Sequence, residues 1–225
     1  MDADRGSATA PRLSRERAAV AALALIDRDG LDAFSMRGLG RELGVDPMAV
    51  YHHVPSRQAL FDAVVEVVWR GVEPPAATGR WEHDLRELAH AVRAVLRRHA
   101  AALPIIATRS SGPAGLRILD HGIAVCRRAG MPAWEAFTLV SAASSFLIGH
   151  ALAEVGVPPD GPTQSGSGGQ EPTPGSVPGG LVDLADALGA GPDLPAWDEL
   201  FAAGLETLLL GARARLDGGV AGEGA

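Results

Sequence analysis

The chain has 225 residues, 47% of them hydrophobic, so it can bury a sizeable core as one compact unit or two small domains. The apolar residues are scattered and form no run of about 18, which predicts no membrane span, and the net charge of −7 argues against indiscriminate nucleic-acid binding. The single cysteine, Cys126, excludes an internal disulfide framework, and residues 1–12 lack the apolar core of a secretory signal, so we expect a cytoplasmic protein.

The N-terminal segment is predicted to be a flexible arm over residues 1–12, followed by a helix over residues 13–28. Ala22 and Ile26 lie four positions apart on the apolar side of this helix. Gly30 is expected to end it, because glycine accepts the backbone conformation found just after a helix.

Two short helices joined by a tight turn are predicted within residues 35–57. Ser35 can cap the first helix, and Gly44 supplies a left-handed turn residue. Asp46 is a good N-cap and Pro47 fits the first helical position, so a second helix starts there. A proline eight residues later ends that helix within about two turns.

The second of these helices is predicted to have a buried back and an exposed front. Val45 and Val50 are expected to pack inward. The small, mostly uncharged outer face consists of Met48, Ala49, Tyr51 and His52. A helix-turn-helix needs this shape to read base edges in the DNA major groove. Spacing alone also fits an ordinary helical hairpin, because helix–glycine–helix junctions are common in all-α proteins.

Further residues favour the DNA-reading interpretation. They are the Gly30 turn, Ser35-Met36-Arg37, Leu43-Gly44-Val45, Tyr51-His52-His53-Val54, and Arg57 followed by Leu60. Together they resemble the DNA-binding domain of the tetracycline-repressor (TetR) family, without a gap over about fifty residues. The rest of the chain resembles the tetracycline-repressor subgroup at Trp81, Thr108-Arg109 and Gly204-Leu205-Glu206. The resemblance implies an N-terminal three-helix DNA-binding domain and a C-terminal helical domain for ligand binding and dimerisation.

A DNA-binding function must depend on local charge, because residues 1–70 contain nine Arg against ten Asp and Glu. All 20 basic residues of the chain are Arg, whose forked side chain pairs with phosphate in a way that Lys cannot. Arg37 and Arg57, each near the start of a helix, are expected to contact phosphate, which sets register without reading bases. The alternative for Arg on a helix is a solvated face.

The remaining sequence is also helical in pattern, and no strand pattern competes, so the predicted fold class is all-α. A connecting helix over residues 56–72 and the prolines at 74 and 75 divide a DNA-binding domain, residues 13–73, from a ligand-binding and dimerisation domain, residues 74–217. Further helices are expected at residues 81–99, 113–128, 132–155, 181–188 and 195–216, with a short irregular turn over 104–109. Residues 156–180, 17 of 25 being Gly, Pro or Ser, are predicted to form a disordered loop, and residues 218–225 a flexible tail.

The helices at 132–155 and 195–216 are rich in small and apolar residues on more than one face. Such residues often form an internal core, but a helix apolar on two sides also suits packing against a second subunit. In the family, two such helices from each protomer form a four-helix interface, so the resemblance implies a homodimer. A two-fold pair would also read two half-sites about 34–36 Å apart, one turn of DNA.

The other C-terminal helices are expected to enclose a small-molecule pocket. In the tetracycline-binding members, a histidine in the short turn helps to hold a drug-bound magnesium ion. The matching residue here is Ile105, and Leu88 and Val92 replace an amide and an aromatic residue of those members. The predicted ligand-binding residues are Leu88, Val92, Ile105, Thr108, Arg109, Ile118, His121, Phe137, Val140 and Ser144.

These replacements predict a more apolar pocket without a metal site, and an effector other than a tetracycline–magnesium complex. No cofactor or protein-bound metal is expected, because His52 and His53 diverge around their helix and His83 and His90 are too far apart on one helix to chelate an ion. Arg109 can pair with an acidic or carbonyl-rich ligand, or can bond to nearby backbone carbonyls. The sequence leaves both open.

The predicted function is a ligand-responsive transcriptional repressor that leaves a palindromic operator when a small molecule binds. The predicted DNA-binding residues are Arg37, Pro47, Met48, Ala49, Tyr51, His52, His53 and Arg57. Two alternatives are an all-α enzyme and a binding protein with a decayed DNA-binding domain. An enzyme would need a nucleophile–base pair or paired carboxylates, and the sequence shows neither. A decayed DNA-binding domain would have lost the capped turn, which is intact in this sequence. Repression and activation are not distinguished by the sequence.

Overall fold

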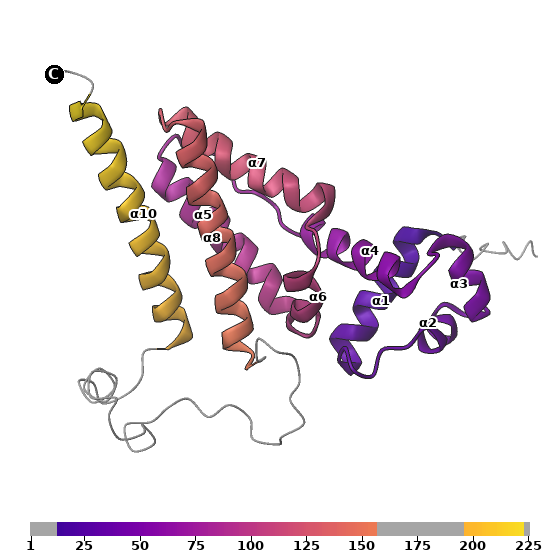
Figure 1. The fold of residues 1–225 in the computed structure, drawn as a ribbon. Helices are drawn as coiled ribbons and strands as arrows, with labels where there is room; N and C mark the ends of the chain where they lie inside the picture. The colour runs from indigo at the N-terminus through magenta and orange to yellow at the C-terminus, as the bar shows by residue number, and fades with distance from the viewer. Residues whose placement is uncertain (1–12, 157–195, 223–225) are drawn as a thin grey trace, which may run out of the picture.

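A computed structural model describes residues 13–156 and 196–222 as an assembly of helices (Figure 1). The helices are α1 (Arg15–Asp29), α2 (Met36–Leu43), α3 (Pro47–His53), α4 (Arg57–Arg70), α5 (Trp81–Arg98), the 3₁₀ turn η1 (Ala100–Ala102), α6 (Leu103–Thr108), α7 (Gly112–Arg128), α8 (Ala133–Glu154) and α10 (Trp197–Gly222). No strand occurs within these described ranges, which confirms the predicted all-α class.

Helices α1, α2 and α3 cluster at one end of the molecule around the first half of α4 (Figure 1). Local capping starts each short helix where the sequence predicts it. The Ser35 hydroxyl accepts a hydrogen bond from the Gly38 amide at 3.1 Å, and the Asp46 carboxylate accepts one from the Met48 amide at 2.7 Å. Gly44 has the left-handed conformation (φ 68°) that turns α2 into α3.

Helix α4 joins the predicted DNA-reading head, α1–α3, to the rest of the molecule. It packs against α1 on one side and against α7 on the other. Val64, Val65 and Val68 are buried along it, and the same continuous core extends into the C-terminal helices. Because this core is closely packed and continuous, a movement of α4 against the C-terminal helices also displaces the head.

Helices α5, α7, α8 and α10 form the C-terminal bundle, with α6 at the end that faces the head (Figure 1). Helix α10 follows residues 157–195 and lies beside α8. Phe201, which is 1% exposed, packs with Leu205 and Leu209 on the buried side of α10.

Two predicted boundaries differ from the structure. Residues 104–109 were expected as an irregular turn, but most of them lie in α6, because Pro104 suits the first helical turn and Ile105 and Ile106 are buried. Helix α10 continues to Gly222 through part of the expected flexible tail, since no proline interrupts it. The predicted arm at 1–12, the helix at 181–188 and all but the first residue of the loop at 156–180 lie outside the described residues.

Helix α8 is more apolar than the sequence-based reasoning allowed. It is 22 residues long, and the mean hydropathy of an 18-residue window within it, 1.6, would suffice to cross a membrane by length and composition. Only 28% of that window is buried in the single chain, although α8 contacts α5, α7 and α10. An apolar surface of this extent suits a helix that packs against a further partner on the sides left uncovered in the single chain.

Cys126 is buried in α7, as a small hydrophobic residue would be. Burial raises the pKa of its thiol to about 11, because the charged thiolate would lose its hydration. The thiol therefore stays protonated at neutral pH, which does not suit a redox sensor.

Candidate DNA-reading head and small-molecule cavity

The outer face of α3 is open to solvent, as a reading helix requires. Tyr51 is 37% exposed and Met48 64% exposed, and both His52 and His53 are also exposed. Val50 is fully buried on the opposite side and packs α3 against the core. Pro47 and Ala49 are half-buried and leave part of their surface accessible. The predicted DNA-facing residues of α3 thus lie on the accessible side of one short helix.

The two predicted phosphate contacts flank this helix. Arg37 is exposed in the first turn of α2, and Arg57 is exposed at the start of α4. The Arg57 guanidinium lies 5.6 Å and 5.0 Å from the ring centroids of Phe34 and Phe61. These ring contacts restrict where the positive charge of Arg57 lies.

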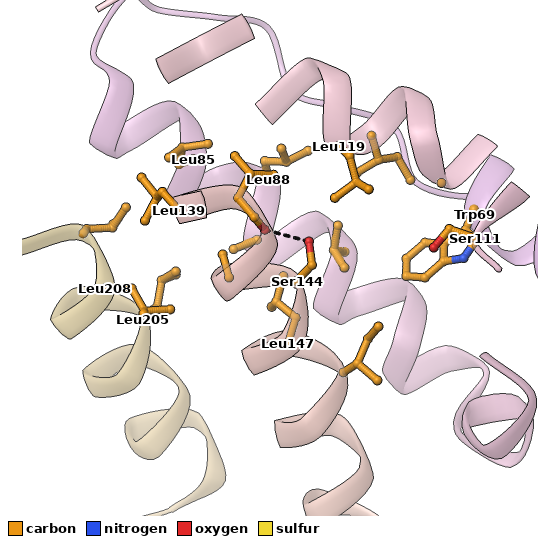
Figure 2. Close-up of a pocket in the computed structure, with 18 residues that line it drawn as sticks. Trp69, Leu85, Leu88, Ser111, Leu119, Leu139, Ser144, Leu147, Leu205 and Leu208 are labelled. Carbon is orange, nitrogen blue, oxygen red and sulfur yellow. Dashed lines mark hydrogen bonds between the residues drawn. The ribbon is translucent and has the colours of Figure 1, made fainter. Parts of the chain in front are cut away.

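The bundle contains an apolar cavity between α4, α5, α7, α8 and α10 (Figure 2). The volume of this cavity is about 100 Å³. The lining residues are Trp69, Leu85, Leu88, Ala89, Val92, Ser111, Gly115, Ile118, Leu119, Leu139, Val140, Ala143, Ser144, Leu147, Ile148, Leu205, Leu208 and Leu209. A concave apolar space with a few polar groups is the usual form of a small-molecule site.

Half of the predicted ligand-binding residues line this cavity. Leu88, Val92, Ile118, Val140 and Ser144 do so, and they come from three different helices. Leu88 and Val92 were predicted from the resemblance to the tetracycline-binding members, and the bundle brings them together with residues of the other two helices.

The other five predicted ligand-binding residues lie outside the cavity lining. Ile105 is buried in α6, and the Thr108 hydroxyl donates a hydrogen bond to the Pro104 carbonyl at 2.7 Å. Phe137 is exposed and stacks on Trp134, with ring centroids 5.6 Å apart. His121 is half-buried on α7, and Arg109 follows α6 as its C-cap.

Arg109 has the structural role that the sequence left as one of two alternatives. Its guanidinium donates hydrogen bonds to the Gln58 carbonyl at 3.2 Å and to the Asp62 carboxylate, both in the first turns of α4. Arg109 thereby ties the end of α6 to the helix that carries the DNA-reading head. No ligand is needed to account for its position.

Sequence reasoning missed Trp69, Ser111 and the α10 residues of the cavity. Trp69 lies at the end of the connecting helix, for which the sequence predicts only a linking role. The sequence predicts dimer interface or core for the helix that carries Leu205 and Leu208, because nothing local indicates that α10 closes the cavity after a long intervening segment. The signal for Trp69 was available, since it lies four positions after Val65 on the apolar side of α4.

A second contact joins α4 to the C-terminal bundle through Glu66. Ser111, the N-cap of α7, makes no side-chain cap, and the Glu66 carboxylate instead accepts a hydrogen bond from the Ala114 amide at 2.9 Å. The same carboxylate accepts one from Arg70 at 3.3 Å. A negative group at a helix N-terminus is favourable for the helix dipole as well as for the hydrogen bond.

Replacing Glu66 with alanine is expected to lower the free energy of unfolding by about 1–2 kcal/mol, because the α7 N-terminus loses its cap. Glu66→Gln keeps an oxygen acceptor for the Ala114 amide and should lose roughly half as much. Urea denaturation followed by circular dichroism measures both values. Equal stability of Glu66→Ala and the wild type would mean that this cap contributes nothing.

Comparison with known proteins agrees with this architecture. Residues 20–64 match the family described as bacterial regulatory proteins, tetR family, and residues 73–216 match the tetracyclin repressor-like C-terminal domain. The HTH-type transcriptional repressor DrrR1 of Streptomyces coeruleorubidus is 28% identical over 148 residues, which cover 64% of this chain and 55% of that protein. The chain thus spans about half the length of this curated relative.

Two solved structures from Streptomyces coelicolor have the same fold. One, described as a possible TetR family transcriptional regulator, gives a TM-score of 0.74 at 29% identity and covers 89% of this chain and 99% of its own. The other, the TetR family protein ActR in complex with actinorhodin, gives 0.75 at 28% identity and covers 91% of this chain and 98% of its own. With both halves matched in order, the chain belongs to the TetR family of bacterial regulatory proteins.

Proposed function

We propose that the protein is a ligand-responsive transcriptional repressor, which binds a palindromic operator as a homodimer and leaves it when a small molecule enters the cavity. The observation that carries this proposal is the combination of an exposed α3 face with an apolar cavity that shares α4 with the head. Residues 13–73 form the DNA-binding domain and residues 74–217 the ligand-binding and dimerisation domain. The site of action is the cytoplasm.

The α3 helix enters the major groove and reads base edges. Tyr51 and His52 contact phosphate or base edges, and Pro47, Met48 and Ala49 offer apolar contact to thymine methyl groups. Arg37, His53 and Arg57 contact the phosphates on either side and set the register. This assignment is supported by the exposure of these side chains around one rigid, capped helix.

Dimerisation uses α8 and α10. Large apolar side chains on these two helices are exposed in the single chain, namely Trp134, Phe137, Leu200 and Leu210. An apolar surface of this kind on two adjacent helices favours burial against its own symmetric copy. The two α3 helices of the pair then reach half-sites about one DNA turn apart.

A ligand in the cavity changes the separation of the two reading helices. The cavity is bordered by Trp69 at the end of α4, and α4 is tied to α6 and α7 through Arg109 and Glu66. The ligand acts only through its different affinities for the two separations. Because Ile105 replaces the metal-holding histidine of the tetracycline-binding members, the effector is not a tetracycline–magnesium complex.

The protein acts as a regulator and not as an enzyme. The cavity lining holds two hydroxyl groups, on Ser111 and Ser144, but no histidine, carboxylate or cysteine that could activate them as nucleophiles. The Ser144 hydroxyl donates a hydrogen bond to the Val140 carbonyl at 2.8 Å. Such a cavity can bind a molecule but offers little for its chemical conversion.

Selection of DNA from a random pool tests the proposed function. We expect enrichment of an inverted repeat whose half-site centres are about 34–36 Å apart, and footprinting should protect both half-sites. Binding should weaken steeply with added salt, because phosphate contacts release counterions. Recovery of no sequence, or of a single half-site bound by a monomer, would contradict the proposal.

A further inference from the structure

We propose that Asp27 and His99 are positioning residues for DNA binding, because their contact fixes the orientation of the head relative to the C-terminal bundle. Asp27 lies on α1 of the head, and His99 is the residue at which α5 of the bundle ends. The inference rests on the proposed function, since the orientation of the head matters for an operator only if two α3 helices must reach two half-sites together. Sequence reasoning assigned no role to either residue.

The contact is short and largely shielded from solvent. His99 Nδ1 lies 2.8 Å from Asp27 Oδ2, and the two side chains are 17% and 28% exposed. An ionised carboxylate can only accept, so the proton of this hydrogen bond is carried by Nδ1. A hydrogen bond to a charged acceptor in a partly buried place is stronger, and less screened by salt, than an ion pair on the open surface.

The local sequence does not supply a partner for the Asp27 carboxylate. Asp27 lies in the last turn of α1, where a negative charge opposes the helix dipole. The residues three and four positions away on either side are apolar or glycine and cannot pair with it. The adjacent Arg28 bonds to Asp29 and Glu42. The carboxylate is therefore matched by the bundle and not by its own helix.

The apolar packing around this contact does not by itself set a direction. Helix α1 lies against the 3₁₀ turn η1, whose three residues are alanines. Methyl groups allow close approach but resist sliding only weakly, whereas a hydrogen bond constrains both distance and angle. The bond between Asp27 and His99 therefore fixes the position of α1 on a smooth apolar surface.

This bond holds the head at a different place from the contacts of α4. Arg109 and Glu66 join α4 to the bundle, whereas Asp27 joins α1 to it. At the opposite end of α1, Glu16 pairs with Arg70 of α4 at 2.9 Å, and the two helices pack against each other. A displacement of α4 therefore carries α1 with it. Because α1 is held by the bundle at one point, the head rotates about that point and does not slide.

Rotation about this point changes the separation of the two α3 helices in a dimer. Without the bond the head keeps its own core, in which Ile26, Leu39 and Val50 are fully buried, but its orientation is less defined. A dimer then presents both α3 helices in the correct register for a smaller fraction of the time. The operator affinity falls by that fraction.

The distance between the head and the bundle tests this positioning without DNA. Spin labels are attached at Met48→Cys on α3 and Leu116→Cys on α7, both at exposed positions, in a Cys126→Ala background. Double electron–electron resonance on the full chain, diluted with unlabelled protein, measures the distance within one protomer. We expect the distance distribution of Asp27→Ala to be at least about twice as wide as that of the unsubstituted chain. His99→Ala removes the same bond from the bundle side and should give the same width.

Glu42→Ala is the matched control for Asp27→Ala. Glu42 is also a carboxylate of the head in an ion pair, with Arg28 at 3.4 Å, but both partners belong to the head. Its loss removes the same charge as Asp27→Ala and should leave the distance distribution unchanged. With the selected operator at one fixed salt concentration, Asp27→Ala should bind about tenfold more weakly, and Glu42→Ala within about twofold of the unsubstituted chain.

A double-mutant cycle separates the contact from the effects of each residue alone. If Asp27 and His99 act through their bond, the variant with both replaced by alanine loses no more operator affinity than either single variant. Additive losses would overturn the proposal, as would distance distributions as narrow as that of the unsubstituted chain. A chain that shows the broadening but selects no operator would refute the proposed repressor and still support the positioning. An operator-binding chain with unchanged distances would do the reverse.

Discussion

Replacing Tyr51 with alanine is expected to lower operator affinity at least about 30-fold. One lost contact at a base edge or phosphate costs about 1–3 kcal/mol, and a symmetric dimer loses it twice. The side chain is 37% exposed and its neighbour Val50 carries the packing of α3, so the fold should be unaffected. Fluorescence anisotropy with the selected operator, at one fixed salt concentration, measures the change.

Leu116→Ala is the matched control for Tyr51→Ala. Leu116 is also an exposed apolar residue, 60% accessible, but it lies on α7 away from the head. Its loss should leave operator affinity within about twofold of the wild type, as surface substitutions usually do. Operator affinity retained by Tyr51→Ala, with an unchanged melting temperature, would mean that α3 does not read DNA in the way proposed.

Replacing Phe201 with alanine should lower the free energy of unfolding by about 3–5 kcal/mol, the usual cost of emptying a buried aromatic site. Phe201 is 1% exposed, and its ring centroid lies 5.3 Å, 5.9 Å and 5.5 Å from the rings of His90, Phe146 and His150. The Arg93 guanidinium lies 4.4 Å from the same centroid. Phe201 therefore joins α10 to α5 and α8. Chemical denaturation measures the loss.

The Leu116→Ala variant also serves as the control for Phe201→Ala. Leu116 lies on α7, outside the two helices proposed to dimerise, and its replacement should change the free energy of unfolding by less than about 1 kcal/mol. The Phe201 variant should also dimerise more weakly, because a loosened α10 no longer presents its outer face; analytical ultracentrifugation measures this. Equal stabilities of the two variants would show that α10 is not anchored by its buried aromatic residue.

The sequence was most informative where structure is determined locally. The start of α3 follows from Asp46 and Pro47, and the turn before it from Gly44, because a cap or a left-handed glycine acts within three or four residues. Leu88 of α5 and Ser144 of α8 were also predicted to face the pocket, and both line the cavity. In all of these cases each signal and its consequence lie on one helix.

The cavity required the whole chain. Arg109 and Phe137 are residue types that often occur in binding sites. In the structure, Arg109 bonds to Asp62 of α4 and Phe137 is exposed. Both outcomes depend on how separate helices pack. Trp69 and Leu205 border one space although a long stretch of sequence separates them. By itself, the sequence determined most of the helices, their caps and the exposed face of α3, because these depend on neighbours along the chain. Only the tertiary structure decided which side chains line the cavity, because that depends on contacts between helices distant in sequence.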